Sequence, residues 1–129
     1  HNPTTQFGGD QAFYHPATDT IRLPKYEDFS GAIAYYGTYL HELTHWTGHQ
    51  SRCDRSLSGQ FGSQSYAFEE LIAELGAAML CNHLGIDSEL ENHAYYLDGW
   101  LQVLKGDNRA FFKAAQKATT AANYLQEQE

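Results

Sequence analysis

Hydrophobic side chains recur at helical spacing along most of the chain. Between about residues 31 and 48 they fall three or four positions apart, which is the period of a helix with one buried face. That stripe comprises Ala32, Tyr36, Tyr39, Leu40, Leu43 and Trp46. Similar patterns predict three further helices, over about 66–84, 89–105 and 109–125. The chain is therefore expected to be mainly helical.

The first thirty residues follow a different pattern. Residues 12–14 and 20–23 are short stretches with aromatic or β-branched side chains, and residues 15–19 between them supply turn chemistry. This arrangement predicts a β-hairpin, whereas residues 1–10, with the Gly8-Gly9 pair, are expected to form a loop or linker. The predicted fold class is α+β: a mainly helical domain with an N-terminal β-hairpin or small sheet packed beside the helix at 31–48.

Residues that favour helix ends stand at the predicted boundaries. Ser30 or Asp28 is a suitable N-cap for the first helix, and Gly48 is a suitable stop for it. Ser88 has capping-box spacing for the third helix, and Asp107 is a suitable N-cap for the fourth.

The chemistry of the chain is concentrated in the first helix, in the motif His41-Glu42-Leu43-Thr44-His45. Residues four apart lie on one face of a helix, so His41 and His45 can direct two imidazoles at one point. Glu42 lies beside them and can reach a water without being a ligand. This is the HExxH pattern of zincins, in which two His ligands bind Zn²⁺ and the Glu is the general base. The alternative is a solvated helix face that carries two histidines.

A Zn²⁺ ion with two His ligands needs a third protein ligand, which the second helix can supply. Glu70 and Glu74 lie four residues apart on one face, and spacing alone leaves open which of them is the ligand and which bonds to a ligand His. Glu69 is offset by one helical step and is expected to be solvated. Cys81, His83 and His93 are weaker competitors for the ligand role.

His49 lies one further turn along the line of histidines. It can be a ligand, a group that bonds to a ligand, or a surface histidine near the helix end. The longer metzincin motif needs a third His at position 51, where the chain has Ser51, so that class does not fit.

Residues 50–65 are polar and rich in Ser and Gly, which predicts a loop. Arg52, Asp54 and Arg55 either brace this loop through ion pairs or remain solvated. A loop of this length beside the motif can form a wall or lid of a cleft.

Composition narrows the setting. The chain has 129 residues, which suits a single domain, residues 1–129, and its formal net charge of −8 gives no basic footprint for nucleic acid. No apolar run approaches the ~20 residues of a membrane span, so no membrane partner is expected. Cys53 and Cys81 are too few for a disulfide framework and are expected to be free thiols of a cytoplasmic protein.

Three stretches carry a resemblance to a known family: YYGTYLHELTHWTGHQSRCDR from Tyr35, FEELIAELGAAMLC from Phe68 and ENHAYYLDGWLQVLK from Glu91. They resemble the zincin-like C-terminal domain of ArdC-type antirestriction proteins, which also occurs in TraC-type plasmid primases and phage polyvalent proteins. The upstream stretch AFYHPATDTIRLPKYEDF resembles the segment before its active-site helix. In that family the domain follows an N-terminal single-stranded DNA-binding domain, so the resemblance implies a fragment or a protein with the peptidase part only. Nucleic acid would then be bound only through that missing domain.

The resemblance also implies roles for particular residues. In the wider gluzincin class the third ligand is the Glu of E-x-x-A, which residues 70–73 match, so Glu70 becomes the expected ligand and Glu74 its neighbour in the second shell. His93 and Tyr96 become candidates for the cleft. Tyr14, Tyr66 and Tyr96 are candidate donors to a developing oxyanion.

These observations lead to two functional hypotheses. In the first, a Zn²⁺ site of His41, His45 and Glu70 hydrolyses peptide bonds of a protein or peptide substrate, with Glu42 as general base. In the second, the domain is a non-catalytic antirestriction module that contacts a host enzyme or a DNA complex and uses zinc as a structural staple. An open coordination position favours the first hypothesis, and a position filled by His49 or Glu74 favours the second.

Overall fold

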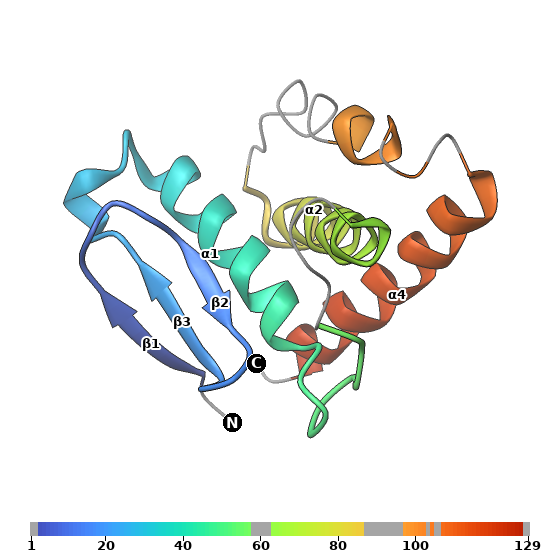
Figure 1. Cartoon of the computed structure of the whole chain (residues 1–129). Helices are drawn as coiled ribbons and strands as arrows, with labels where there is room; N and C mark the ends of the chain where they lie inside the picture. Colours follow the sequence, from blue (N-terminus) through green and yellow to red (C-terminus); the bar gives the residue numbers. More distant parts are fainter. Residues whose placement is uncertain (1–2, 58–62, 87–96, 103, 105–106, 128–129) are drawn as a thin grey trace.

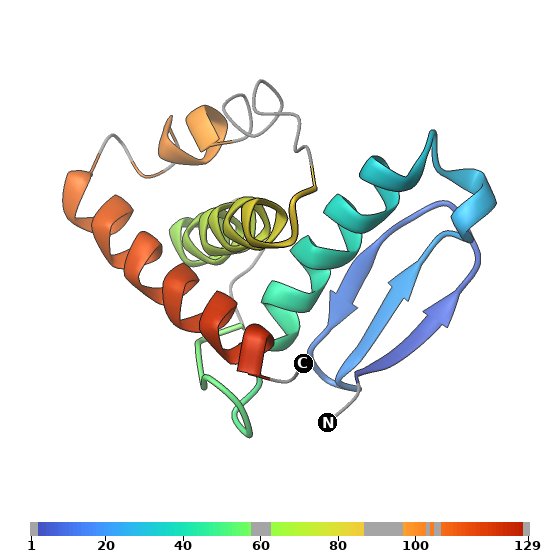
Figure 2. The ribbon, with the colours of Figure 1, turned by 180° about the vertical axis from the view of Figure 1, so that it is seen from behind.

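A small sheet and a group of helices lie on opposite sides of one central helix (Figures 1 and 2). The computed structural model describes residues 3–57, 63–86, 97–102, 104 and 107–127. Helix α1 (Ala32–Trp46) packs on the sheet with one side and on α2 (Gln64–Leu84) with the other, and α4 (Asn108–Glu127) covers α2. This is the α+β, mainly helical architecture that the sequence predicts.

The sheet has three strands in the order β1-β3-β2. The predicted hairpin is confirmed: β2 (Phe13–His15) and β3 (Thr20–Leu23) are antiparallel, with Tyr14 opposite Ile21. The prediction of a loop over residues 1–10 is wrong for β1 (Thr4–Phe7), which pairs with β3 in parallel. Most of β1 is exposed, so its polar sequence carries no alternation of buried and exposed positions. Pairing with β3, and not burial of its own side chains, holds this strand.

The sheet meets α1 through a compact apolar layer. Ile21 and Leu23 of β3 are fully buried and cluster with Tyr14 and Trp46. Trp46 lies in the last turn of α1, so this layer fixes the sheet against the half of the helix that carries the histidines.

The boundaries of α1 differ from the prediction in their capping. Gly31 is at the N-cap and no side chain caps the helix, so Ser30 and Asp28 do not have that role; Asp28 ends a short 3-10 helix, η1 (Tyr26–Asp28). At the other end α1 stops at Trp46, two residues before Gly48. A Cβ on Gly48 would lie 2.8 Å from the Leu57 side chain, so this glycine leaves room for the following loop.

The predicted stripe of α1 is correct at its C-terminal half but wrong at Ala32 and Tyr36, which are both exposed. Tyr36 is 48% exposed. Tyr36 contacts Tyr35 edge-on within an aromatic group that also includes Tyr26, Phe29 and Tyr39. Aromatic side chains satisfy a helical apolar pattern equally well in a core or in such a surface group, so periodicity alone does not distinguish the two.

The predicted second and fourth helices are confirmed as α2 and α4. Helix α2 begins two residues earlier than expected, where the Ser63 side chain accepts a hydrogen bond from the Tyr66 backbone, and it ends at Gly85 in the left-handed conformation. Asp107 caps α4, as predicted, by accepting hydrogen bonds from the Arg109 and Ala110 backbones. Of the predicted third helix, residues 97–102 are described and helical, and Leu104 is described as part of a turn; the start predicted near Ser88 lies outside the described residues.

Helices α1 and α2 lie in close contact at Gly76. A Cβ built on Gly76 would lie 2.6 Å from Cγ2 and 3.0 Å from Oγ1 of Thr44, a residue of the HExxH motif. Thr44 is fully buried, and its hydroxyl donates to the Leu40 carbonyl oxygen at 2.8 Å. Only glycine at position 76 therefore lets the acidic stretch of α2 lie against the histidines.

Replacement of Gly76 by Ala should destabilise the fold, because the added methyl group overlaps a buried side chain that cannot rotate away. Overpacking of this kind costs about 1–3 kcal/mol in the free energy of unfolding, which chemical denaturation can measure. Gly37→Ala is the matched control, since a Cβ at Gly37 of α1 has no neighbour within 4 Å. That change should stabilise the helix by about 0.5–1 kcal/mol. Equal effects at the two glycines would contradict the close helix contact.

Candidate metal centre

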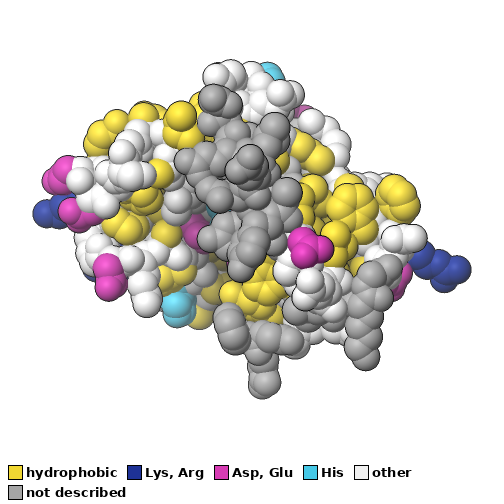
Figure 3. Space-filling model, turned by 90° about the horizontal axis from the view of Figure 1, so that it is seen from above, with side chains coloured by type: hydrophobic (Ala, Val, Ile, Leu, Met, Phe, Trp, Pro, Cys, Tyr) yellow, Lys and Arg dark blue, Asp and Glu magenta, His cyan; other side chains and the backbone are white. Residues whose placement is uncertain are grey.

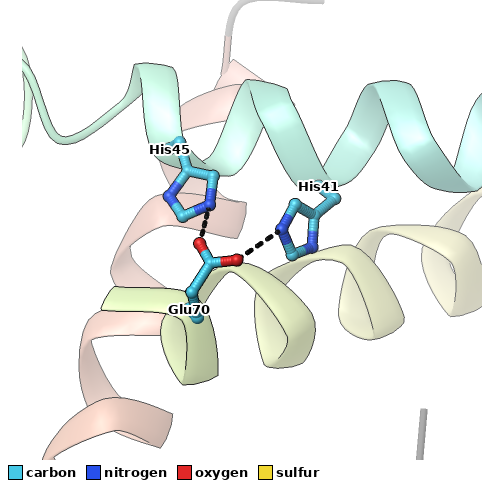
Figure 4. Close-up of side chains that lie close together, drawn as sticks. All are labelled: His41, His45 and Glu70. Carbon is cyan, nitrogen blue, oxygen red and sulfur yellow. Dashed lines mark ion pairs between the residues drawn. The ribbon is translucent and has the colours of Figure 1, made fainter. Parts of the chain in front are cut away.

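The two histidines of α1 and one glutamate of α2 point toward a common centre (Figure 4). The His45 Nε2 atom lies 2.5 Å from Glu70 Oε2, and the His41 Nε2 atom lies 3.6 Å from Glu70 Oε1. Ligand atoms of His41, His45 and Glu70 all lie within 4.8 Å of one another. Two imidazole nitrogens and one carboxylate oxygen at this spacing are a donor set that fits a divalent metal ion.

The remaining nitrogens of both histidines are held by further carboxylates of α2. Glu74 Oε1 lies 3.2 Å from His41 Nδ1, and Glu69 Oε2 lies 2.9 Å from His45 Nδ1. Each imidazole thus directs Nδ1 at a carboxylate and Nε2 at the centre. A partner on one ring nitrogen fixes the tautomer and orients the other nitrogen toward a metal, as in many metal sites.

The prediction that Glu69 is solvated is wrong. Glu69 is only 8% exposed, and it bonds to His45 and to Arg55 of the loop after α1. Burial would raise the pKa of its carboxyl, but the hydrogen bonds from His45 and Arg55 outweigh that effect and hold the pKa below its usual value. The one signal in the sequence was the pair Glu69-Glu70, whose neighbouring side chains can approach two sides of the same imidazole.

Glu42 lies beside this centre without joining the ligand group. It is 6% exposed, and burial raises the pKa of its carboxyl although the positive charges of His41 and His45 oppose the rise. The backbone N–H of Tyr14, in strand β2, donates a hydrogen bond to it. The contact of β2 with α1 thereby sets the direction of the Glu42 carboxylate.

A cavity of about 310 Å³ opens at the centre. Its lining includes the three residues of the ligand group, the Glu42 carboxyl beside them, Tyr66 and three residues of the sheet region: His41, His45, Glu70, Glu42, Tyr66, Ala12, Phe13 and Tyr14. The volume is at the lower end of the range for small-molecule sites. A small carbonyl group can therefore reach the base and the ligand atoms together.

Two tyrosines that the sequence singles out differ in their position. Tyr66 lies in the cavity wall, and burial together with the negative charges of Glu70 and Glu42 raises the pKa of its hydroxyl. The Tyr14 hydroxyl instead donates its one proton to Asp19 at 2.6 Å, so Tyr14 is not available as an oxyanion donor. Tyr14 serves the site through its backbone.

None of the other described candidates joins the ligand group. His49 follows the end of α1, and its Nδ1 atom lies 2.8 Å from the Ser51 hydroxyl. Among the described residues, neither His49 nor Cys81 nor His83 belongs to the ligand group. His93 and Tyr96 lie outside the described residues. Cys53 and Cys81 are free thiols, as predicted.

The histidine pKa values predict that metal binding depends on pH. Burial would lower both pKa values, but hydrogen bonds with Glu70 and Glu74 raise the pKa of His41 to about 10, and those with Glu69 and Glu70 raise the pKa of His45 to about 9. Both imidazoles are therefore in the positively charged form at pH 7 in the metal-free protein, with a proton on each ring nitrogen. A metal must displace the proton from Nε2 of each. Metal affinity should rise with pH and level off above the two pKa values.

Isothermal titration calorimetry in buffers of different ionisation enthalpy measures the protons released on metal binding. We expect nearly two per metal at pH 7. An affinity that does not change between pH 6 and pH 8 would contradict the raised histidine pKa values.

Comparisons with known proteins identify the family of the chain. A family described as zincin-like metallopeptidase matches residues 2–117. The chain belongs to the zincin-like metallopeptidase family. This zincin-like chain is 45% identical over 123 residues to the uncharacterized protein y4eC of Sinorhizobium fredii, covering 95% of this chain and 40% of that protein. It is 44% identical over 121 residues to the DNA primase TraC of Escherichia coli, covering 94% of this chain and 8% of the primase.

Solved structures give the same fold. The Mn(II)-bound crystal structure of the antirestriction protein ArdC from plasmid R388 aligns with a TM-score of 0.82 and 45% identity, covering 97% of this zincin-like chain and 47% of ArdC. The metal-free structure of ArdC aligns with a TM-score of 0.78. The chain thus spans less than half the length of these relatives. None of the described helices combines the length and hydropathy that a membrane crossing requires.

Proposed function

We propose that this zincin-like domain is a zinc-dependent peptidase. The observation that carries the proposal is the arrangement of three ligand side chains around one point, with the buried carboxyl of Glu42 beside them on the wall of an open cavity. His41, His45 and Glu70 would hold the metal. When bound, the metal would act as a Lewis acid that polarises a carbonyl and lowers the pKa of a water molecule.

Glu42 is the general base of the proposed reaction. Its carboxylate takes a proton from the attacking water and passes that proton to the leaving amine. Burial raises its pKa, which makes the carboxylate a stronger base toward the attacking water. The Tyr66 hydroxyl, in the wall of the same cavity, is the proposed donor to the oxyanion.

The ligand count favours catalysis over a purely structural metal. Among the described residues the group contains three ligands, whereas structural zinc sites normally have four. Glu74 bonds to the far nitrogen of His41, and His49 bonds to Ser51, so neither completes the coordination. A metal held by these three residues would keep a fourth position for water or substrate.

Zinc is the proposed metal because two imidazoles and one carboxylate form a common catalytic zinc set. The related ArdC structure is Mn(II)-bound, and the same donors accept several divalent ions. Side-by-side measurement of Zn²⁺ and Mn²⁺ affinity decides between them for this chain.

The proposed setting is antirestriction by a mobile element, in the cytoplasm, with a protein or peptide as substrate. It is supported by the similarity to ArdC and to plasmid primases. Nucleic acid would be engaged through a further domain. The second candidate is a non-catalytic antirestriction module that binds a host enzyme or DNA complex, which the name of the ArdC relative favours.

The test is hydrolysis of an unfolded protein such as casein by the zinc-loaded chain. Hydrolysis that is lost with a chelator and restored by zinc supports the peptidase. Zinc bound at one ion per chain, without hydrolysis of casein or of peptide libraries, would replace the peptidase by the binding module.

A further inference from the structure

Arg55 makes the densest set of polar contacts near the proposed metal centre. Its side chain is 4% exposed. Its Nε atom donates to Glu69 Oε1 at 2.9 Å, and its Nη2 atom donates to Glu69 Oε2 at 3.0 Å. The guanidinium also donates to the Thr44 carbonyl oxygen at 2.7 Å and to the Thr47 hydroxyl at 2.9 Å. It therefore joins the end of α1 to the start of α2 at one point.

The same contacts lead to the centre through a single carboxylate. Glu69 Oε2, which accepts a hydrogen bond from Arg55, also lies 2.9 Å from Nδ1 of His45. A two-point contact between guanidinium and carboxylate fixes the carboxylate plane, which one hydrogen bond cannot do. The direction in which Glu69 meets the imidazole is thus set by Arg55.

We propose that Arg55 is a positioning residue for the metal centre. By clamping Glu69 it holds His45 with its proton on Nδ1 and with Nε2 directed at Glu70, and thereby raises metal affinity. This proposal rests on the proposed metal site but not on hydrolysis, so a chain that binds metal without cleaving peptides still tests it.

The competing explanation is that Arg55 only braces the loop after α1, and Arg52 provides the control for it. The Arg52 side chain is 3% exposed, donates to the Trp46 carbonyl oxygen at 2.8 Å, and pairs with Asp19. Its guanidinium lies 3.8 Å from the ring centroid of Trp46. Arg52 is thus as deeply buried in the same loop, but its recorded partners lie outside the metal centre.

The experiment compares Arg55→Lys with Arg52→Lys in the full chain. Metal affinity is measured by competition with a chromophoric zinc chelator, and the free energy of unfolding by denaturation of the metal-free protein. Lysine keeps the charge but loses the two-point geometry. We expect Arg55→Lys to weaken zinc binding about 10- to 100-fold, the usual effect of losing an outer-shell partner. Arg52→Lys should leave affinity unchanged even where it lowers stability.

A second variant covers the case in which Arg55→Lys does not fold. Glu69→Gln keeps the size of the side chain but loses the charge that Arg55 clamps, and it should weaken zinc binding to the same extent. NMR of ¹⁵N-labelled His45 in the zinc-loaded protein adds a readout that loop stability does not affect, because the chemical shift of the Nδ1 proton reports the hydrogen bond to Glu69. This shift should change in Arg55→Lys and stay at the wild-type value in Arg52→Lys. Unchanged affinity in both Arg55→Lys and Glu69→Gln, equal losses in Arg55→Lys and Arg52→Lys, or no zinc binding by the wild type would each overturn the proposal.

Discussion

Glu42→Gln should abolish peptide hydrolysis while leaving the metal bound. The amide has the shape of the carboxyl but cannot accept the proton of the attacking water, and positioned acid–base groups contribute about 10²- to 10⁴-fold to such rates. Glu42 does not belong to the ligand group, so zinc content should remain at the wild-type level. Casein hydrolysis and elemental analysis of the same preparation measure the two quantities together.

A surface glutamate provides the control for this variant. Glu27 is exposed in η1 and takes no part in the centre, so Glu27→Gln should retain full activity. Hydrolysis retained in Glu42→Gln would remove Glu42 as the base. Loss of zinc together with activity would indicate a structural role in its place.

Glu70→Ala should remove the metal from the protein. Glu70 offers one oxygen to each histidine, at 3.6 Å from His41 Nε2 and 2.5 Å from His45 Nε2. Among the described residues it is the carboxylate that joins both histidines in the ligand group. Loss of an outer-shell partner lowers metal affinity about 10- to 100-fold, so loss of a ligand should lower it further. Calorimetry with Zn²⁺ measures the affinity, and circular dichroism confirms that the variant is folded.

Glu74→Ala is the matched comparison, since Glu74 lies one turn further along α2 and its Oε1 atom lies 3.2 Å from Nδ1 of His41, the nitrogen that is directed away from Glu70. Its effect on zinc affinity should lie within the outer-shell range. The reverse order, with the larger loss in Glu74→Ala, would make Glu74 the ligand and Glu70 its partner.

The parts of this structure that local patterns encode could be predicted from sequence. Helical periodicity places α1, α2 and α4 to within about two residues, and the turn-rich stretch between two apolar segments predicts the hairpin. The four-residue spacing of His41 and His45 implies a common target on any helix. The E-x-x-A resemblance then distinguished Glu70 from Glu74, which spacing could not.

Features that depend on distant partners could not be predicted. Strand β1 is held by pairing with β3, sixteen positions along the chain, with Thr4 opposite Thr20 and Phe7 opposite Leu23, and its own sequence is that of a loop. The burial of Glu69 depends on Arg55, which approaches from another segment. The position of Glu69 next to Glu70 on the helix therefore did not indicate that it is buried. The sequence likewise does not show why position 76 needs glycine, because the reason is the contact with Thr44 of another helix.

The carboxylates around the histidines have a consequence for how the protein matures. In the metal-free state the charges of Glu69, Glu70 and Glu74 are balanced by two protonated imidazoles and Arg55. The folded chain therefore does not depend on an ion to neutralise this buried site, unlike small zinc domains that unfold without metal. Metallation becomes a step after folding, at which protons are exchanged for whichever divalent ion the cell supplies. A folded, metal-free store of the protein can thus accumulate, and metal supply alone would decide when the proposed centre is complete.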